Sequence, residues 1–191
     1  MKLFFVRHGE IPANRDKIYA GSSSERLTLV GRKQADEIGR ILAQHNIEAV
    51  FHSPLMRTKE TAEIICQYMA CEPRADESFD ELKMGPWEGL TEHEIASRYP
   101  DQWRLWNSQP ANVLIAGRET LSQLQRRVLT GVRAILSKAP SLQTVLIVTH
   151  VAIIRVIILS VENGNLNHYR QIPVPNCSVF SYNSIDFKDL L

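Results

Sequence analysis

Two histidines follow apolar runs at positions where buried strands are expected to end. Residues 2–6 are rich in aromatic and β-branched side chains and lead into Arg7 and His8, and residues 145–149 are almost wholly apolar and lead into His150. Such runs are typical of strands buried on both faces. In a doubly wound α/β sheet, ligands bind beyond the C-terminal ends of the strands. We therefore expect both imidazoles to lie where a ligand would bind.

The types of these residues suit the transfer of a phosphoryl group, which needs a nucleophile, neutralisation of charged oxygens and a proton for the leaving oxygen. A neutral His8 could attack phosphorus in line if its other ring nitrogen is held as a donor, for example to the Gly9 carbonyl. Arg7 and Arg57 carry planar, permanently charged guanidinium groups that can each bind two phosphate oxygens. A protonated His150 could stabilise charge in the transition state. Gly9 is expected to let the chain turn away and a ligand approach closely.

Acidic residues crowd the stretch from 76 to 92, which includes Asp80 and Glu81. A carboxyl that acts as proton donor and then as base must be protonated when the leaving oxygen departs and ionised when water attacks. Partial desolvation raises the pKa of a carboxyl and would suit both steps. Composition alone does not choose among these acids. Structural roles are also open, since His150 could be a buried core histidine and Arg57 a solvated charge on a helix.

Four sequence strings carry these residues in order along the chain. They are RHGE at 7–10, SPLMRTKETA at 53–62, ELKMGPWEG at 81–89 and VTH at 148–150. Together they resemble the histidine phosphatase superfamily, also called the phosphoglycerate mutase-like family, from residue 2 to about Tyr182. The resemblance implies a phosphohistidine on His8, with the phosphoryl group bound by Arg7, Arg57 and His150.

The resemblance also implies roles that the residue types leave open. The working acid of the family stands four residues before a glycine, here Gly85, which selects Glu81, with Asp80 as the fallback. Asn14 lies six residues after the nucleophile, where the family places a phosphate contact, and Gly21 matches a backbone contact in the same loop. The N–H of Val151, at the start of a helix, is expected to point toward the same anion.

Three neighbouring residues are expected to be structural. Glu10 is interpreted as an anchor for arginines, whereas Glu60 and Thr61 are interpreted as helix-capping and surface residues outside the site. No metal or other cofactor is expected, because no acids or histidines show metal-ligand spacing and the arginines can neutralise the phosphate charge.

The chain departs from the family pattern at several positions. Ile11 stands where Thr or Ser is usual, Ile18 where many members carry Arg, and Val151-Ala152 where glycines usually follow the second histidine. With Met84, the two isoleucines could make the mouth of the pocket more apolar than a sugar-phosphate enzyme would need. Equal turnover of small sugar phosphates and aromatic phosphomonoesters would count against this hypothesis.

Strand and helix signals alternate along the chain. This alternation predicts an α/β three-layer sandwich with a mostly parallel central sheet and helices on both faces, in one domain over residues 1–191. Thr28 and Thr91 are predicted helix N-caps, the second in a capping box with Glu94. The helix after Thr91 is expected to end at Pro100, and the stretch from 103 to 114 to be irregular. The predicted strands cover residues 2–6, 48–53, 73–76, 145–149 and 177–182, and the longest helix covers 119–136.

Composition narrows the choice of partner. Of the 191 residues, 44% are hydrophobic, and the net charge is +1. This balance gives no field to attract nucleic acid or an anionic membrane. The three cysteines form no pair or zinc pattern, and the first apolar run is too short for a signal peptide or a membrane span. We expect a cytoplasmic protein that binds a small phosphorylated metabolite, and a homodimer is the assembly to test.

The leading hypothesis is therefore a metal-independent phosphomonoesterase of the small bacterial branch that includes α-ribazole and phosphoserine phosphatases. A mutase, which returns the phosphoryl group to a second hydroxyl, is the alternative. Mutases of the family carry an added basic segment, whereas residues 100–118 offer only Arg104 and Arg118. A non-catalytic sensor of phosphorylated ligands is the third possibility, and the absence of any phosphohistidine would favour it.

Overall fold

The computed structural model describes residues 1–190, and within them five strands form one sheet in the order β3-β2-β4-β1-β5. The strands are β1 (Lys2–Arg7), β2 (Ala49–His52), β3 (Pro73–Ala75), β4 (Thr144–Thr149) and β5 (Val179–Asn183). Strands β1 to β4 are parallel, whereas β5 pairs antiparallel with β1 at one edge. The mostly parallel sheet predicted from the sequence is confirmed.

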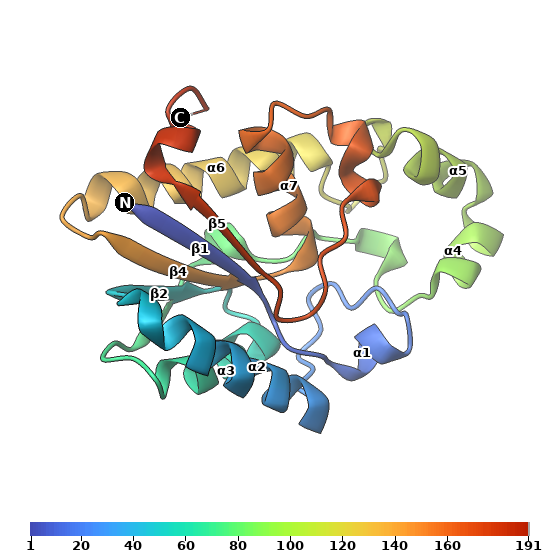
Figure 1. Cartoon of the computed structure of the whole chain (residues 1–191). Coiled ribbons are helices and arrows are strands. Elements are labelled where there is room, and N and C mark those ends of the chain that lie inside the picture. The colour runs from blue at the N-terminus through green and yellow to red at the C-terminus, as the bar shows by residue number, and fades with distance from the viewer. Residues whose placement is uncertain (191) are drawn as a thin grey trace.

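Helices cover both faces of this sheet (Figure 1). They are α1 (Pro12–Arg15), α2 (Leu29–Leu42), α3 (Met56–Cys66), α4 (Glu92–Arg98), α5 (Pro100–Ser108), α6 (Leu121–Lys138) and α7 (Val151–Val161). In Figure 1, α2 and α3 lie on one face, α6 and α7 lie on the other, and α4 and α5 extend the structure to one side. The predicted three-layer sandwich is therefore observed.

The central strand β1 contributes side chains to both layers. Phe4 and Val6 belong to the buried cluster beneath α2 and α3, whereas Leu3 and Phe5 belong to the cluster beneath α6 and α7. This division follows from the strand geometry, because successive side chains point to opposite faces. Burial on both sides explains why the sequence of β1 is a continuous apolar run rather than an alternating one.

The pairing register aligns the ends of β1 and β4. Arg7 pairs with Thr149, so the residues that follow each strand, His8 and His150, emerge side by side at the carboxyl edge. The N–H of His8 donates to the Thr149 carbonyl at 2.9 Å, which extends the pairing one residue beyond β1. The sheet thus places the two imidazoles where the sequence predicted them.

The predicted helix caps are present. The Thr28 hydroxyl accepts a hydrogen bond from the N–H of Gly31 at the start of α2. At α4, Thr91 and Glu94 form the predicted capping box, with each side chain accepting from the other residue's backbone N–H. These bonds satisfy N–H groups that have no partner within a helix.

The region around Pro100 differs from the prediction. Helix α4 ends at Arg98, but Pro100 then begins α5, so residues 103–108 are helical rather than irregular. Proline suits the first turn of a helix because no hydrogen bond to its nitrogen is required there. Trp106 on α5 is buried, and its ring centroid lies 6.0 Å from that of Trp87, so aromatic packing holds this helix in place.

Two smaller boundaries also differ. The segment with Asn14 and Gly21, which was expected to be a loop, contains the short helix α1. The last strand begins at Val179 rather than at Cys177, because Cys177 has a left-handed φ of 55° and belongs to the turn before β5. Over residues 1–190, no helix is both long and apolar enough to cross a membrane.

Candidate active site

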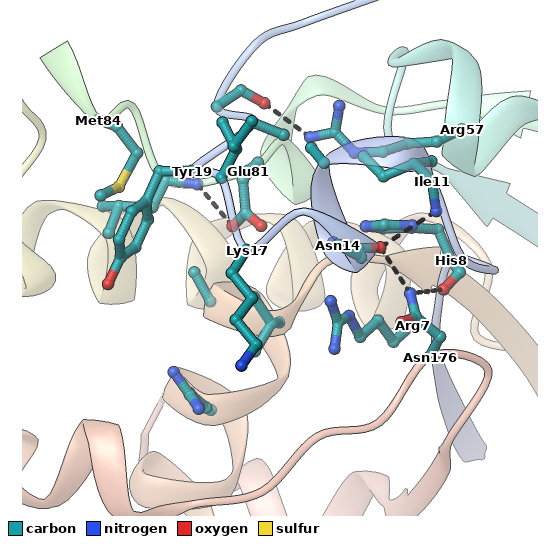
Figure 2. A pocket seen from close by; sticks show the side chains of 18 of the residues that line it. Arg7, His8, Ile11, Asn14, Lys17, Tyr19, Arg57, Glu81, Met84 and Asn176 are labelled. Atoms are coloured by element: carbon teal, nitrogen blue, oxygen red, sulfur yellow. Dashed lines mark hydrogen bonds between the residues drawn. The ribbon is translucent and has the colours of Figure 1, made fainter. Parts of the chain in front are cut away.

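A cavity of about 470 Å³ lies at the carboxyl ends of β1 and β4. Its wall contains seven of the eight residues predicted for the site, namely Arg7, His8, Asn14, Gly21, Arg57, Glu81 and Val151. Figure 2 shows Arg7, His8, Arg57 and Glu81 around this pocket. The eighth residue, His150, is fully buried behind the wall, and its ring centroid lies 5.3 Å from that of His8. The structure therefore gathers all eight residues in one place.

The His8 imidazole is held in one orientation by its own loop. Nδ1 lies 2.7 Å from the Gly9 carbonyl oxygen, as the sequence analysis suggested. A carbonyl can only accept, so Nδ1 carries the proton and Nε2 carries the lone pair at the cavity wall. Burial lowers the pKa of His8 well below its ordinary value, and the charges of Arg57 and Arg7 lower that pKa further. The ring is therefore neutral at neutral pH.

The loop after β1 is packed tightly against α2 and α3. A Cβ on Gly9 would lie 2.4 Å from the Gly31 carbonyl oxygen. The lack of a side chain therefore allows α2 to pack closely, whereas we had expected it to allow the approach of a ligand. The Gly9 N–H donates to the Thr61 hydroxyl at 3.1 Å, and that hydroxyl donates to the Arg57 carbonyl at 2.6 Å. The prediction that Thr61 is a surface residue is wrong, because it is fully buried and holds the loop that follows His8.

The two arginines are desolvated cations. Arg7 donates from Nη1 to the Val174 carbonyl at 2.6 Å, and its buried Nε has no hydrogen-bond partner within residues 1–190. Arg57 donates to the Gly21 carbonyl at 2.7 Å and to the Ser23 carbonyl at 3.0 Å. Burial lowers the pKa of Arg7 to about 10 and also lowers the pKa of Arg57. Both groups remain charged at neutral pH, in surroundings where an anion would be strongly attracted.

A chain of hydrogen bonds sets the tautomer of His150. The Ser53 hydroxyl donates to Asp80 Oδ1 at 2.6 Å and lies 2.8 Å from His150 Nε2. Because Ser53 has given its only proton to the carboxylate, it must accept from Nε2–H. His150 Nδ1 then carries the lone pair, which accepts from Arg57 Nε at 3.3 Å.

The charge state of His150 follows from the same neighbours. Burial lowers the pKa of His150 well below its ordinary value, and the charges of Arg57 and Arg7, together with His8, act in the same direction. The protein groups on their own therefore favour a neutral imidazole, whereas a protonated His150 was expected to stabilise charge in the transition state. An anion bound beside Nδ1 would raise this pKa and draw a proton to that nitrogen.

Glu81 is the acid that the fold brings to the cavity. Its Oε1 accepts from the Leu82 N–H at 2.9 Å, and its Oε2 lies 4.0 Å from His150 Nδ1. Burial raises the pKa of Glu81, although the charge of Arg57 opposes the rise. Asp80, the fallback, does not line the cavity and binds Ser53 instead. Of the two acids, only Glu81 can reach a substrate.

The residues predicted to contact substrate lie on three different segments of the cavity wall. Asn14 on α1 accepts from the Asn176 side chain through Oδ1, at 2.9 Å. Gly21 has a left-handed φ of 51°, and a Cβ there would lie 2.4 Å from the Glu88 carboxyl carbon. Val151 is the first residue of α7. All three positions are open to a ligand in the cavity, and their phosphate contacts stay predictions.

Glu60, and not Glu10, is the acid that pairs with arginines near the loop after β1. Glu10 accepts from the Thr28 hydroxyl at 2.7 Å and forms no ion pair with an arginine within residues 1–190, so its interpretation as an arginine anchor is wrong. Glu60 is the anchor instead. Its nearly buried carboxylate pairs with Arg26 at 2.7 Å and with Arg32 at 3.2 Å.

Several residues of the site were not predicted. Asn176 donates to the His8 carbonyl at 3.0 Å and so ties His8 to the turn before β5. Ser53 lies within a motif string, but its contact with His150 crosses 97 residues. Arg155 was not considered, although it is the only charged residue of α7. Among the described residues, no three His, Cys, Asp or Glu side chains converge on a position that could hold a metal ion.

Neighbouring imidazoles at the carboxyl edge of a parallel sheet, with arginines around them, define a site for phosphoryl transfer. A family model described as the histidine phosphatase superfamily (branch 1) matches residues 3–188, and the chain belongs to that superfamily. It is a phosphatase of this superfamily.

Two curated relatives illustrate the similarity. The chain is 29% identical over 178 residues to phosphoserine phosphatase 1 of Hydrogenobacter thermophilus. The matched region covers 93% of this chain and 84% of the relative. It is 31% identical over 160 residues to the uncharacterized phosphatase PhoE of Bacillus subtilis. That matched region covers 84% of this chain and 77% of PhoE. Other relatives, from Mycobacterium, are longer, and the matched region spans 46% of their length.

A solved structure confirms the fold. The structure of YhfR from Bacillus stearothermophilus superposes with a TM-score of 0.90 at 28% identity, and covers 95% of this chain and 90% of YhfR.

Proposed function

We propose that this phosphatase hydrolyses a phosphomonoester through a phosphohistidine formed on His8. The observation that supports this most directly is the 2.7 Å contact between His8 Nδ1 and the Gly9 carbonyl. It leaves Nε2 as the unprotonated nitrogen, and the low pKa of the ring keeps that nitrogen nucleophilic at neutral pH. His150 and the two arginines then surround the group that is transferred.

In the first step, His8 Nε2 forms a bond to phosphorus while the bond from phosphorus to the ester oxygen breaks. Glu81, whose raised pKa favours the protonated carboxyl, gives its proton to the departing oxygen. Arg7 and Arg57 neutralise charge on the phosphoryl oxygens, and His150 donates from Nδ1 once the anion has drawn a proton there. The alcohol leaves as a neutral molecule.

In the second step, water attacks the phosphohistidine. The Glu81 carboxylate takes a proton from the water as the new oxygen–phosphorus bond forms and the nitrogen–phosphorus bond breaks. Inorganic phosphate leaves, and His8 and Glu81 return to their starting protonation states. Asn14, Gly21 and Val151 are proposed to position the phosphoryl group by polar contacts from the cavity wall.

Rapid-quench labelling tests this proposal. The protein is mixed with phosphoserine labelled in its phosphate, quenched in alkaline detergent, which preserves phosphohistidine, and digested for mass spectrometry. We expect the label on His8 and free phosphate as the final product. The variant His8→Ala should lose both label and turnover, whereas His45→Ala, which changes an exposed histidine stacked on Phe4, should keep both.

Two outcomes would refute the proposal. Wild-type turnover by His8→Ala would mean direct attack by water. Label that passes to an added acceptor alcohol without release of phosphate would indicate the mutase reaction instead.

A further inference from the structure

The outer part of the cavity carries positive charge that the proposed phosphoryl site does not use. Five basic side chains line the cavity, against two acidic ones, Glu81 and Glu92. Arg7 and Arg57 belong to the phosphoryl site. Among the remaining three cations, Arg170 pairs with Glu92 at 3.1 Å. Lys17 and Arg155 are therefore left as cations in the wall.

Arg155 is held by one hydrogen bond and one ring contact, and neither uses the terminal nitrogens of its guanidinium group. Its Nε donates to the Ile172 carbonyl at 2.8 Å, and its guanidinium carbon lies 5.1 Å from the centre of the Tyr169 ring. Within residues 1–190, Nη1 and Nη2 form no hydrogen bond and no ion pair. These two nitrogens form the end of a rigid fork, whose geometry matches the two oxygens of a carboxylate or phosphate.

The position of Arg155 on α7 places this side chain in the wall of the cavity. It lies one helical turn after Val151, on the same face of the helix, and both residues line the cavity. All other residues of α7 except Ser160 are apolar. The charge of Arg155 also lowers the pKa of Arg7, so the two cations are close enough to repel each other. An anion between them would relieve that repulsion.

Lys17 completes the charged part of the wall. It follows α1 with a left-handed φ of 56°, and its amine has no partner within the described residues. Figure 2 shows its side chain extending over the pocket. Tyr19, Trp106 and Tyr169 supply the adjoining aromatic surface. A pocket of this size fits a small molecule with a short apolar body.

We infer that Arg155 and Lys17 form a subsite for a second oxyanion, so that the preferred substrates are phosphomonoesters whose alcohol part carries a carboxylate or another phosphate. The inference rests on the proposed function, because the first anion is the phosphoryl group beside His8. It also modifies the expectation of an apolar mouth. Ile11, Ile18 and Met84 do line the cavity, but charged groups stand among them.

Matched pairs of substrates test the subsite. Phosphoserine and phosphoethanolamine differ by one carboxylate, and fructose 1,6-bisphosphate and fructose 6-phosphate differ by one phosphate. For wild type, we expect kcat/KM to favour the more anionic member of at least one pair by about tenfold or more, since hydrogen bonds to charged groups have that strength. The preferred pair identifies which oxyanion the subsite accepts.

Three variants locate the preference. Arg155→Gln should reduce the wild-type ratio about tenfold, mainly through KM of the more anionic substrate. Lys17→Asn, chosen because asparagine tolerates a left-handed φ, should reduce the ratio about two- to fivefold at its exposed position. Arg104→Gln, which removes an exposed arginine on α5, should leave the ratio unchanged.

Equal kcat/KM within both pairs for wild type would overturn the subsite, as would a ratio that survives in both Arg155→Gln and Lys17→Asn. If Arg155→Gln does not fold, Lys17→Asn alone decides, because Lys17 is exposed. Failure of the proposed function is a separate result, recognised by turnover that survives in His8→Ala with every substrate.

Discussion

Ser53 should control catalysis through His150 without touching the substrate. Its hydroxyl is fully buried, donates to Asp80 at 2.6 Å and accepts from His150 Nε2 at 2.8 Å. The substitution Ser53→Ala removes that acceptor and leaves a buried imidazole N–H without a partner. It also leaves Asp80 without its short hydrogen bond. Both the stability of the protein and the orientation of the ring should suffer.

The magnitude follows from the burial of the groups involved. A buried donor left unsatisfied costs about 1–3 kcal/mol of unfolding free energy, which corresponds to a fall in Tm of about 3–10 °C for a chain of this size. A loss of about 1.4 kcal/mol of transition-state stabilisation at His150 lowers kcat about tenfold. We therefore expect Ser53→Ala to lower kcat at least about tenfold, with a smaller change in KM.

A second buried serine provides the matched control. Ser160 on α7 accepts from Gln125 Nε2 at 2.9 Å, away from the cavity. Ser160→Ala should lower Tm but leave kcat unchanged. The assay is steady-state hydrolysis of p-nitrophenyl phosphate, with Tm measured by calorimetry on the same samples. If Ser53→Ala loses stability but keeps wild-type kcat, then Ser53 does not orient His150 and the hydrogen-bond chain is only structural.

Three further predictions concern the acid, the nucleophile and the loop that holds it. Glu81→Gln should slow alkyl phosphates at least about a hundredfold but slow p-nitrophenyl phosphate much less, because nitrophenolate leaves without a proton; an unchanged leaving-group dependence would remove Glu81 from its role. The acid limb of kcat/KM should lie below pH 6.5, because the His8 ring stays neutral until the pH falls to its lowered pKa. An acid limb above pH 6.5 in a pH–rate profile would contradict this. Gly31→Ala would place a Cβ 2.2 Å from the Glu10 carbonyl oxygen, and should lower unfolding free energy by about 1–3 kcal/mol in urea titrations; wild-type stability would contradict the close packing described above.

The sequence was most informative where local pattern and topology coincide. Apolar runs that end at His8 and His150 identified two strands, and the parallel pairing of those strands brings the histidines together. Ser53 and Asn176 could not be found in this way, because their contacts with the site cross 97 and 168 residues. Such contacts depend on which loops lie next to each other in the folded chain, and the residues around Ser53 and Asn176 do not indicate this.

Other differences have local causes. Proline can follow the end of one helix or begin another, and only the packing of the tryptophans on α5 shows that Pro100 begins a helix. Arg155 lies outside the predicted site because none of the four motif strings contains it. A single cation in an otherwise apolar helix is itself a signal, since an unpaired charge is rarely retained there without use.

The sheet order has a consequence for the newborn protein on the ribosome. Strand β1 is translated first, yet its two neighbours in the sheet, β4 and β5, are translated last. At ordinary speeds of synthesis the apolar strand waits roughly 7–30 seconds for them, so it must be sheltered in the meantime. Arg7 and His8 also depend on Val174 and Asn176 for their positions. A fragment released early would therefore carry Arg7 and His8 without the late segment that holds them in place.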